Sequence, residues 1–319
     1  MIKEFSRKYL YDKIGIFKLE ILRSRTFLFV FGLKLLSSFL FASKYLTDLF
    51  ARFVNYFIIS GFQNPYNFFY NLDIVNIFPY PKLMLWILSV PRFVFSPFLS
   101  SSYLDVNFLH IFIYRLPLLL ADTVIFVILV RWLKNKQHKV LKYYWCSPIL
   151  FYISYIHGQL DVLPIMFLFV CLYLLFKERF YWSVVFLGLA LSVKTGLLVV
   201  YPFILVYFFL QRIKLKQFIV LGIIPIMVFL SFNIDYLFTT SFVEIVLKTK
   251  EQFKIFDFYY TVNSDFVIYF VPLAYIILFV KSLTFKVFNR DIFLMFLGFS
   301  FGILTLFIPP MQGWYFWII

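Results

Sequence analysis

The sequence predicts an all-α fold, a polytopic bundle of about 9 to 11 transmembrane helices with amphipathic helices on its outer face. Composition is the first reason, because 63% of the 319 residues are hydrophobic, including 48 Phe and 23 Tyr. Too little polar surface remains to coat a soluble globule of this length. The second reason is a series of apolar runs bounded by charges, at 26–43, 106–133, 141–157, 161–176, 180–193, 196–210, 218–234, 265–280 and 292–308.

The chain divides into three expected parts. Residues 1–25 carry seven Lys or Arg without a small-residue cleavage site, which indicates an interfacial basic helix, or a positive flank orienting the first span. Residues 26–210 form a first membrane module with an outer loop at 44–105. Residues 211–319 form a variable module with an outer loop at 235–265, in which charges at near-helical spacing predict an amphipathic helix, either a lid or a solvated surface. Because the sequence stops inside another apolar stretch, we expect a truncated C-terminus.

Charge predicts the topology. Residues 83–99 are ambiguous, since Pro91, Arg92 and Pro97 interrupt an apolar run. If this run only dips into the outer interface, twenty Lys and Arg fall on the inner side and eight on the outer, as the positive-inside rule requires. The N-terminus is then cytoplasmic. The net charge of +15 is therefore a topology signal, and no nucleic-acid partner is expected.

Membrane lipids are the expected surroundings. The Phe, Ile, Lys and Tyr bias suits a bacterial inner membrane, with the endoplasmic reticulum membrane as the alternative. Cys146 and Cys171 lie inside apolar runs and imply neither a disulfide framework nor a cysteine metal site. The inner loops lack a phosphate-binding glycine loop, so no nucleotide site is expected there.

The most informative short stretch is His157-Gly158-Gln159-Leu160-Asp161, which places three polar side chains at the end of one apolar run and the start of another. Ionisable groups at membrane depth cost about 2.5–3.5 kcal/mol each, so such a cluster indicates a structural or functional role. Lys194 lies between two further runs on the same outer side. Its ammonium suits a phosphate oxygen, or else extends to the interface. His157 could donate to the same phosphate or be a satisfied interfacial histidine.

Asp48 follows the first span, in Thr47-Asp48-Leu49. A carboxylate at the membrane edge can act as general base for a hydroxyl acceptor, or simply favour a helix N-terminus. Asp48 and Asp161 could also hold a divalent cation such as Mg or Mn, although no residue demands one. In the loop that follows, Asn64, Tyr66, Tyr80 and Lys82 could line a sugar or head-group site, or form an aromatic belt.

Arg115 and Asp122 lie in the second long run, seven residues apart and so on one helix face. A direct pair or a shared polar partner is expected, and we interpret these two residues as a structural polar pair that fastens this span to its neighbours.

The order of these motifs resembles the membrane-embedded GT-C glycosyltransferases. The likeness runs from Thr47-Asp48 through Gly61-x-x-Asn64-Pro65-Tyr66, Phe78-Pro79-Tyr80-Pro81 and Arg115 to Asp122, then Ser147-Pro148 and His157 to Asp161, and ends with Gly188-Leu189-Ala190 through Lys194 to Pro202. It is similar to the bacterial polyprenol-phosphate-mannose-dependent mannosyltransferases and, more distantly, to the catalytic subunit of the GPI mannosyltransferase.

The resemblance implies a bundle of the GT-C type that transfers a hexose, in particular mannose, from a polyprenyl-phosphate donor to a glycan or lipid-linked acceptor on the non-cytoplasmic face. Asp48 would activate the acceptor hydroxyl, Lys194 and His157 would neutralise the departing phosphate, and Gln159 and Asp161 would position sugar or phosphate. One departure is that only Asp73 is available as a second early acid.

Two other functions remain open from the sequence. Short broken helices with buried charges also mark transporters and lipid flippases, although no internal repeat is evident here. A non-catalytic subunit of a glycan-assembly complex would keep the same fold without the activity.

Overall fold

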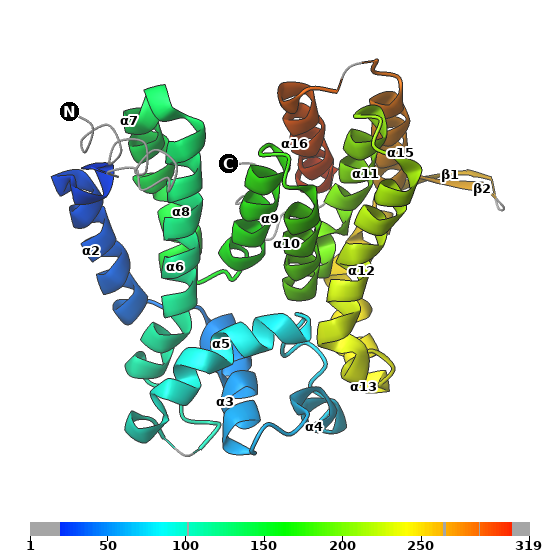
Figure 1. Cartoon of the computed structure of the whole chain (residues 1–319). Helices are drawn as coiled ribbons and strands as arrows, with labels where there is room; N and C mark the ends of the chain where they lie inside the picture. The colour runs from blue at the N-terminus through cyan, green and yellow to red at the C-terminus, as the bar shows by residue number, and fades with distance from the viewer. Residues whose placement is uncertain (1–19, 101, 264–265, 287, 308–319) are drawn as a thin grey trace, which may run out of the picture.

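The computed structural model describes residues 20–100, 102–263, 266–286 and 288–307. These residues are mostly helical, as expected (Figure 1). The expected interfacial helix at 1–25 and the C-terminal stretch at 308–319 lie largely outside this range. Only the short 3₁₀ turn η1 (Glu20–Arg23) and the start of α2 represent the former.

Three helices are long and apolar enough to cross a membrane, by length and composition. They are α6 (Phe108–Trp132), α12 (Leu215–Leu237) and α16 (Arg290–Phe307). A fourth span arises if α2 (Arg25–Leu40) is joined with Tyr45–Ile59, which comprises the π-helical turn η2 (Tyr45–Phe50) and α3 (Ala51–Ile59). These two halves are bent by 63° at the break between them.

The expected 9 to 11 spans are therefore not confirmed. Four further apolar segments are shorter: α9 (Val162–Leu175), α10 (Phe180–Val193), η7 with α11 (Thr195–Leu210) and α15 (Phe270–Leu283). A 14-residue helix such as α9 is about 21 Å long, less than a hydrocarbon core of about 30 Å. The run at 141–157 breaks into η5 (Leu141–Trp145), α8 (Pro148–Phe151) and η6 (Tyr152–His157), because Ser147 and Pro148 start a new helix there.

The long helix α6 forms where the sequence predicts, at 108–132 against an expected 106–133. Asn107 caps it by accepting from His110 N at 3.1 Å, and the His110 side chain in turn accepts from Asn107 N. The helix packs against α2, α5 and α9, and Arg115 and Asp122 are both buried. It is thus the central element through which the N-terminal helices contact the rest of the bundle.

A layer of short helices lies across one end of the long ones (Figure 1). It contains α3, α4 (Pro65–Asn71) and α5 (Lys82–Val94), with the 3₁₀ turn η3 (Ser96–Phe98) following. α5 runs across the ends of α9 and α10, and it contacts α3, α6, α10 and α12. This crosswise position agrees with the prediction that residues 83–99 do not span. We call this layer, with the turns at 157–161, 194–196 and 235–242, the α5 end.

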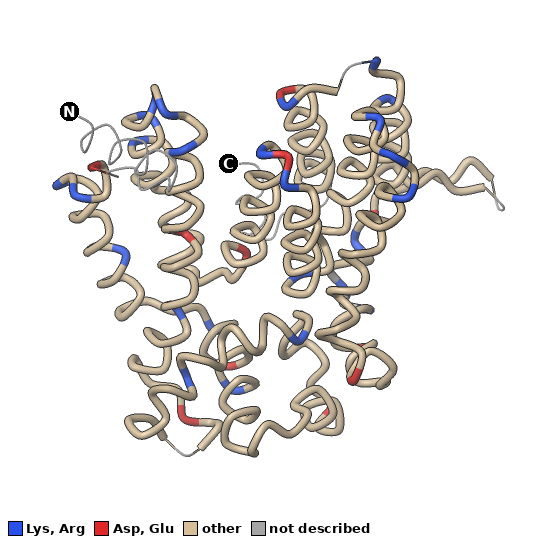
Figure 2. The backbone as a smooth tube through the Cα atoms, viewed as in Figure 1, with Lys and Arg blue, Asp and Glu red and all other residues tan. Residues whose placement is uncertain are grey.

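The opposite end holds α7 (Gln137–Val140), the 3₁₀ turn η4 (Lys134–Lys136) and the turns between α9 and α10, α11 and α12, and α15 and α16 (Figure 1). Lysines and arginines gather there (Figure 2), and we call it the basic end. Most of the loops that the sequence assigned to opposite membrane faces therefore lie at opposite ends of the bundle, whereas the β1–β2 segment of the expected outer loop projects from its side (Figure 1).

The segment at 235–265 is not one amphipathic helix, which corrects that expectation. It contains α13 (Thr240–Phe242), η8 (Val243–Leu247), α14 (Lys250–Phe253), η9 (Lys254–Phe256) and the strand β1 (Tyr259–Asn263). β1 pairs antiparallel with β2 (Phe266–Tyr269), with Tyr259 opposite Tyr269. Aromatic and β-branched residues in Tyr259-Tyr260-Thr261-Val262 favour a strand over a helix. The purely all-α prediction is wrong at this hairpin.

Helix α10 packs closely on α12 at Gly188, where a Cβ would lie 2.6 Å from Val228 Cβ and 2.9 Å from Pro225 O. Because the Pro225 carbonyl belongs to the backbone of α12 and cannot move without distorting the helix, we expect Gly188→Ala to destabilise the protein by about 1–3 kcal/mol. Gly298→Ala is the matched control, since no heavy atom lies within 4 Å of a Cβ there. Thermal unfolding of both purified variants in one detergent checks this, and equal midpoints would contradict it.

Candidate functional site at the α5 end

The centre of the site is an ion pair between the ends of two neighbouring helices. Lys194 Nζ lies 2.5 Å from Asp161 Oδ1, although 33 residues separate them. Asp161 precedes the first residue of α9 and Lys194 follows the last residue of α10. Helix dipoles favour a carboxylate at the first position and a cation at the second. Because α9 and α10 pack side by side, the two motifs meet.

This pair is asymmetric in its exposure. The Asp161 side chain is 1% exposed, whereas that of Lys194 is 18% exposed. The lysine ammonium also lies 5.9 Å from the centre of the Tyr80 ring. A buried carboxylate thus holds a partly accessible cation beside an aromatic ring, an arrangement suited to an anionic ligand that approaches from the α5 end.

Asp48 lies in η2, just after the break that follows α2. Its carboxylate is exposed to solvent and accepts a hydrogen bond from Thr47 Oγ1 at 2.9 Å. Two neighbours, Leu46 and Phe50, place this turn at the α5 end, whereas the exposed Asp48 side chain, two residues from each, projects from the opposite face of the turn. Leu46 approaches Gly158, where a Cβ would lie 3.5 Å from Leu46 Cδ2, and the Phe50 ring packs 5.5 Å from the Tyr80 ring. Asp48 therefore belongs to the same end as Lys194.

The 157–161 segment covers this region with mixed polarity. His157 and Gln159 are half-buried, and Gly158, Leu160 and Asp161 are buried. Burial, and then the nearby Arg115 guanidinium, lower the pKa of His157, which lies outside the candidate spans. Its imidazole is therefore neutral near pH 7. A neutral ring can still donate a hydrogen bond to a phosphate oxygen, and the role implied for His157 stays a prediction.

The four residues expected to bind substrate have different positions. Asn64 caps α4, accepting from Tyr66 N at 3.0 Å and Asn67 N at 3.3 Å. Tyr66 is completely buried and donates to Tyr80 O at 2.7 Å, so both side chains hold the loop in its fold. Lys82 pairs with Asp235. Only Tyr80, among these four, contacts the Lys194 region by a ring interaction that the structure records.

Lys82 connects the start of α5 to the C-terminal end of α12. Its Nζ lies 4.3 Å from the Tyr236 ring centre, and its backbone N–H donates to Asn233 Oδ1 at 3.0 Å. These contacts hold the C-terminal end of α12, and α13 after it, against the start of α5.

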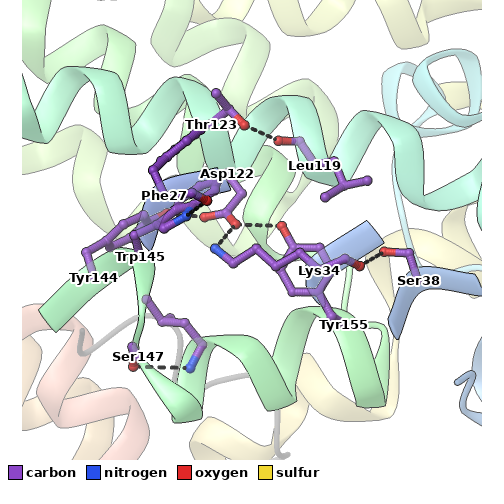
Figure 3. Close-up of polar contacts among 11 residues, drawn as sticks. Phe27, Lys34, Ser38, Leu119, Asp122, Thr123, Tyr144, Trp145, Ser147 and Tyr155 are labelled. Atoms are coloured by element: carbon purple, nitrogen blue, oxygen red, sulfur yellow. Dashed lines mark hydrogen bonds and ion pairs between the residues drawn. The ribbon is translucent and has the colours of Figure 1, made fainter. Parts of the chain in front are cut away.

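Arg115 and Asp122 do not contact each other, but they share Tyr155. The Tyr155 hydroxyl donates to Asp122 Oδ2 at 2.5 Å, and its carbonyl accepts from Arg115. Figure 3 shows the network around the aspartate, in which Lys34 Nζ lies 2.7 Å from Oδ2 and Tyr144 donates to Oδ1 at 2.8 Å. The Lys34 ammonium also lies 3.4 Å from the Trp145 ring centre. The network ties α2, α6, η5 and η6 together.

Sequence reasoning missed Lys34, Tyr144, Trp145 and Tyr155. A signal was present, because Lys34 and Arg115 are cations inside apolar runs, and Asp122 is the acid inside the run that holds Arg115. A lone lysine in one span and a lone aspartate in the next predict a buried pair.

No three His, Cys, Asp or Glu side chains in the described ranges gather as a metal site would require. The Mg or Mn alternative at Asp48 and Asp161 stays a prediction.

Fold and site together define a mostly helical protein with three candidate membrane spans, or four with the bent pair, and a charged site at one end. Comparison with protein families, curated proteins and solved structures finds no match. The likeness to GT-C glycosyltransferases therefore rests on the order of motifs in the sequence.

Proposed function

We propose that this chain is a membrane-embedded glycosyltransferase that moves a hexose, in particular mannose, from a polyprenyl-phosphate donor to a hydroxyl acceptor at the α5 end. The observation that carries the proposal is the partly accessible Lys194, held by the buried Asp161 at the end that also contains the turn of Asp48. An anchored cation and an exposed carboxylate at the same membrane edge are the two charges that such a transfer requires.

The chemistry follows from these two charges. Asp48 accepts the proton of the acceptor hydroxyl as the acceptor oxygen bonds to the anomeric carbon. The bond from that carbon to the phosphate oxygen breaks, and its electron pair stays on the phosphate. The Lys194 ammonium stabilises the negative charge that develops there, which supports departure of the lipid phosphate. The buried Tyr80 ring lies beside Lys194 and supports its position.

The positive-inside rule supports an orientation in which the basic end faces the cytoplasm. The α5 end then faces the opposite side, and the donor is a lipid-linked sugar displayed there. A bacterial inner membrane is the proposed location. The acceptor is a glycan or a lipid-linked glycan.

A transfer assay tests this function. The purified full chain in nanodiscs is incubated with a panel of radiolabelled polyprenyl-phosphate hexoses and membrane-extract acceptors. We expect label to appear in an acceptor together with release of polyprenyl phosphate. If no donor in the panel is consumed although polyprenyl phosphate binds, a non-catalytic subunit is the better account.

Lys194→Ala should raise the apparent Michaelis constant for the donor by about 10- to 100-fold and leave that for the acceptor within about twofold, because a hydrogen-bonded charge contact is lost. The same assay, run with each substrate varied in turn, measures both. Lys248→Ala, which alters an exposed pair with Glu244, is the matched control. Equal effects on donor and acceptor would argue against phosphate binding by Lys194.

A second function, transport or lipid flipping, is favoured by one observation. The buried Lys34–Asp122 pair joins the interior of α2 to the interior of α6, and ionisable residues inside apolar helices often mark a translocation path. The two functions separate cleanly in liposomes, because a flippase moves intact polyprenyl-phosphate sugar across the bilayer without cleaving it.

A further inference from the structure

Arg115 is a fully buried guanidinium in α6. Its Nη1 donates to Ser37 O at 3.2 Å and also to Tyr155 O. These carbonyls lie in the last turns of α2 and η6, so the negative ends of two helix dipoles face the cation. This placement accounts for the burial of one guanidinium nitrogen.

The other two nitrogens are not accounted for. Nε and Nη2 of Arg115 have no hydrogen-bond partner among the residues that the structure describes, and no carboxylate in those ranges forms an ion pair with it. Leaving buried charged donors unpaired is costly in any protein. Nε and Nη2 form one edge of the planar guanidinium, the edge that matches two oxygens of a phosphate or carboxylate.

A second buried arginine shows that this chain can satisfy such a group completely. Arg92 donates from Nε to Asn55 Oδ1 at 2.8 Å, from Nη1 to Ser96 Oγ at 3.2 Å and from Nη2 to Ser100 O at 3.0 Å. Neutral oxygens alone suffice there. Arg52 and Arg290 also have a buried Nε without a hydrogen-bond partner in the described ranges, so Arg115 differs from them in that both Nε and Nη2, a complete edge, lack partners.

The free edge lies against the backbone of Gly158. A Cβ at Gly158 would lie 2.7 Å from Arg115 Nη2, and Gly158 has the left-handed φ of +81°. Glycine is thus required at this position both by conformation and by space. Gly158 belongs to the segment that ends at Asp161, the partner of Lys194. Arg115 therefore lies directly beneath the covering segment of the site.

The charges around Arg115 also favour an anion. Through Tyr155 it belongs to the network of Lys34 and Asp122, which holds two basic side chains and one acid in the described part of the chain. An excess of buried positive charge in a low-dielectric region attracts a negative ligand strongly.

We propose that Arg115 is an anion-binding subsite, whose Nε and Nη2 edge binds two oxygens of a lipid-linked phosphate when the His157–Asp161 segment shifts about Gly158. This inference rests on the proposed function, because it assigns to Arg115 the most buried contact with the phosphate of the proposed donor. Lys194 then binds the same phosphate from the accessible side.

Equilibrium binding of polyprenyl phosphate and of neutral polyprenol to the full chain in nanodiscs tests the subsite. We expect wild-type protein to prefer the phosphate, and Arg115→Gln to weaken phosphate binding by about 10- to 100-fold without changing polyprenol binding. Arg115→Lys should retain only part of the wild-type affinity for polyprenyl phosphate, because lysine keeps the positive charge but lacks the planar edge. Arg92→Lys, a change at the fully partnered arginine, should keep the preference.

Gly158→Ala is an independent variant that keeps every charge. Its methyl group displaces Nη2, so the preference for phosphate should fall while polyprenol binding persists. Unchanged preference in both Arg115→Gln and Gly158→Ala would overturn the subsite and leave the proposed function standing. A wild-type protein without any preference for phosphate over polyprenol would overturn both.

Discussion

Asp48→Asn should abolish measurable sugar transfer, with turnover lower by about 10²- to 10⁴-fold, the usual contribution of a general base. The amide has nearly the same shape as the carboxylate but cannot accept the proton of the acceptor hydroxyl. The side chain is exposed in η2, and its recorded hydrogen bond is from Thr47 Oγ1, which an amide oxygen can also accept. Folding should therefore be unaffected, and donor binding should remain near that of wild type.

Radiolabel transfer measured alongside donor binding checks this expectation. Asp257→Asn is a suitable control, because Asp257 is another exposed acid, outside the cluster around Lys194. Wild-type transfer by Asp48→Asn would refute its role as the base. A matching loss in Asp257→Asn would show instead that transfer depends on general surface charge.

Asp122→Leu should be the most destabilising single change in the bundle, by about 3–5 kcal/mol, because it leaves the buried Lys34 ammonium without its counter-ion. It also removes the acceptor of the Tyr144 and Tyr155 hydroxyls. Denaturant unfolding of the purified protein in mixed micelles, followed by tryptophan fluorescence, measures the change. Trp145 is a direct reporter, since its ring lies against Lys34.

A double variant separates the ion pair from simple packing. Lys34→Met combined with Asp122→Leu replaces both charges by apolar groups, so it should be more stable than Asp122→Leu alone. The recovery is partial, because the two tyrosine hydroxyls still lack their acceptor. Lys248→Met at the exposed Glu244 pair should leave stability unchanged. Strict additivity of the two single changes would mean that Lys34 and Asp122 are not coupled.

Much of the helical framework follows from local signals. The ends of α6 were predicted within two residues, because the apolar run at 106–133 is long and uninterrupted enough to specify the helix. The break at 141–157 was not predicted, although Ser147 followed by Pro148 is a start signal for a new helix, because the apolar length of the run was given more weight. The hairpin after Asp257 was missed because charged residues at helical spacing precede it.

The site was predictable where a polar residue stands at a helix end. Asp161 and Lys194 carry their own signal in the sequence, and packing of α9 on α10 joins them. The partner of Asp122 lies 88 residues away, so only the presence of charges inside two separate apolar runs indicated it, and that signal was missed. Tyr66 shows the opposite error, since an aromatic in a polar loop suggested a ligand surface and the fold buries it completely.

The central claim is that the α5 end binds the phosphate of a polyprenyl-linked donor. A cryo-electron microscopy structure of the wild-type chain in nanodiscs with polyprenyl phosphate tests it most directly. We expect phosphate density within hydrogen-bonding distance of Lys194 Nζ, on the side of α5 and η2. Phosphate density at the basic end beside α7, with none near Lys194, would contradict the account.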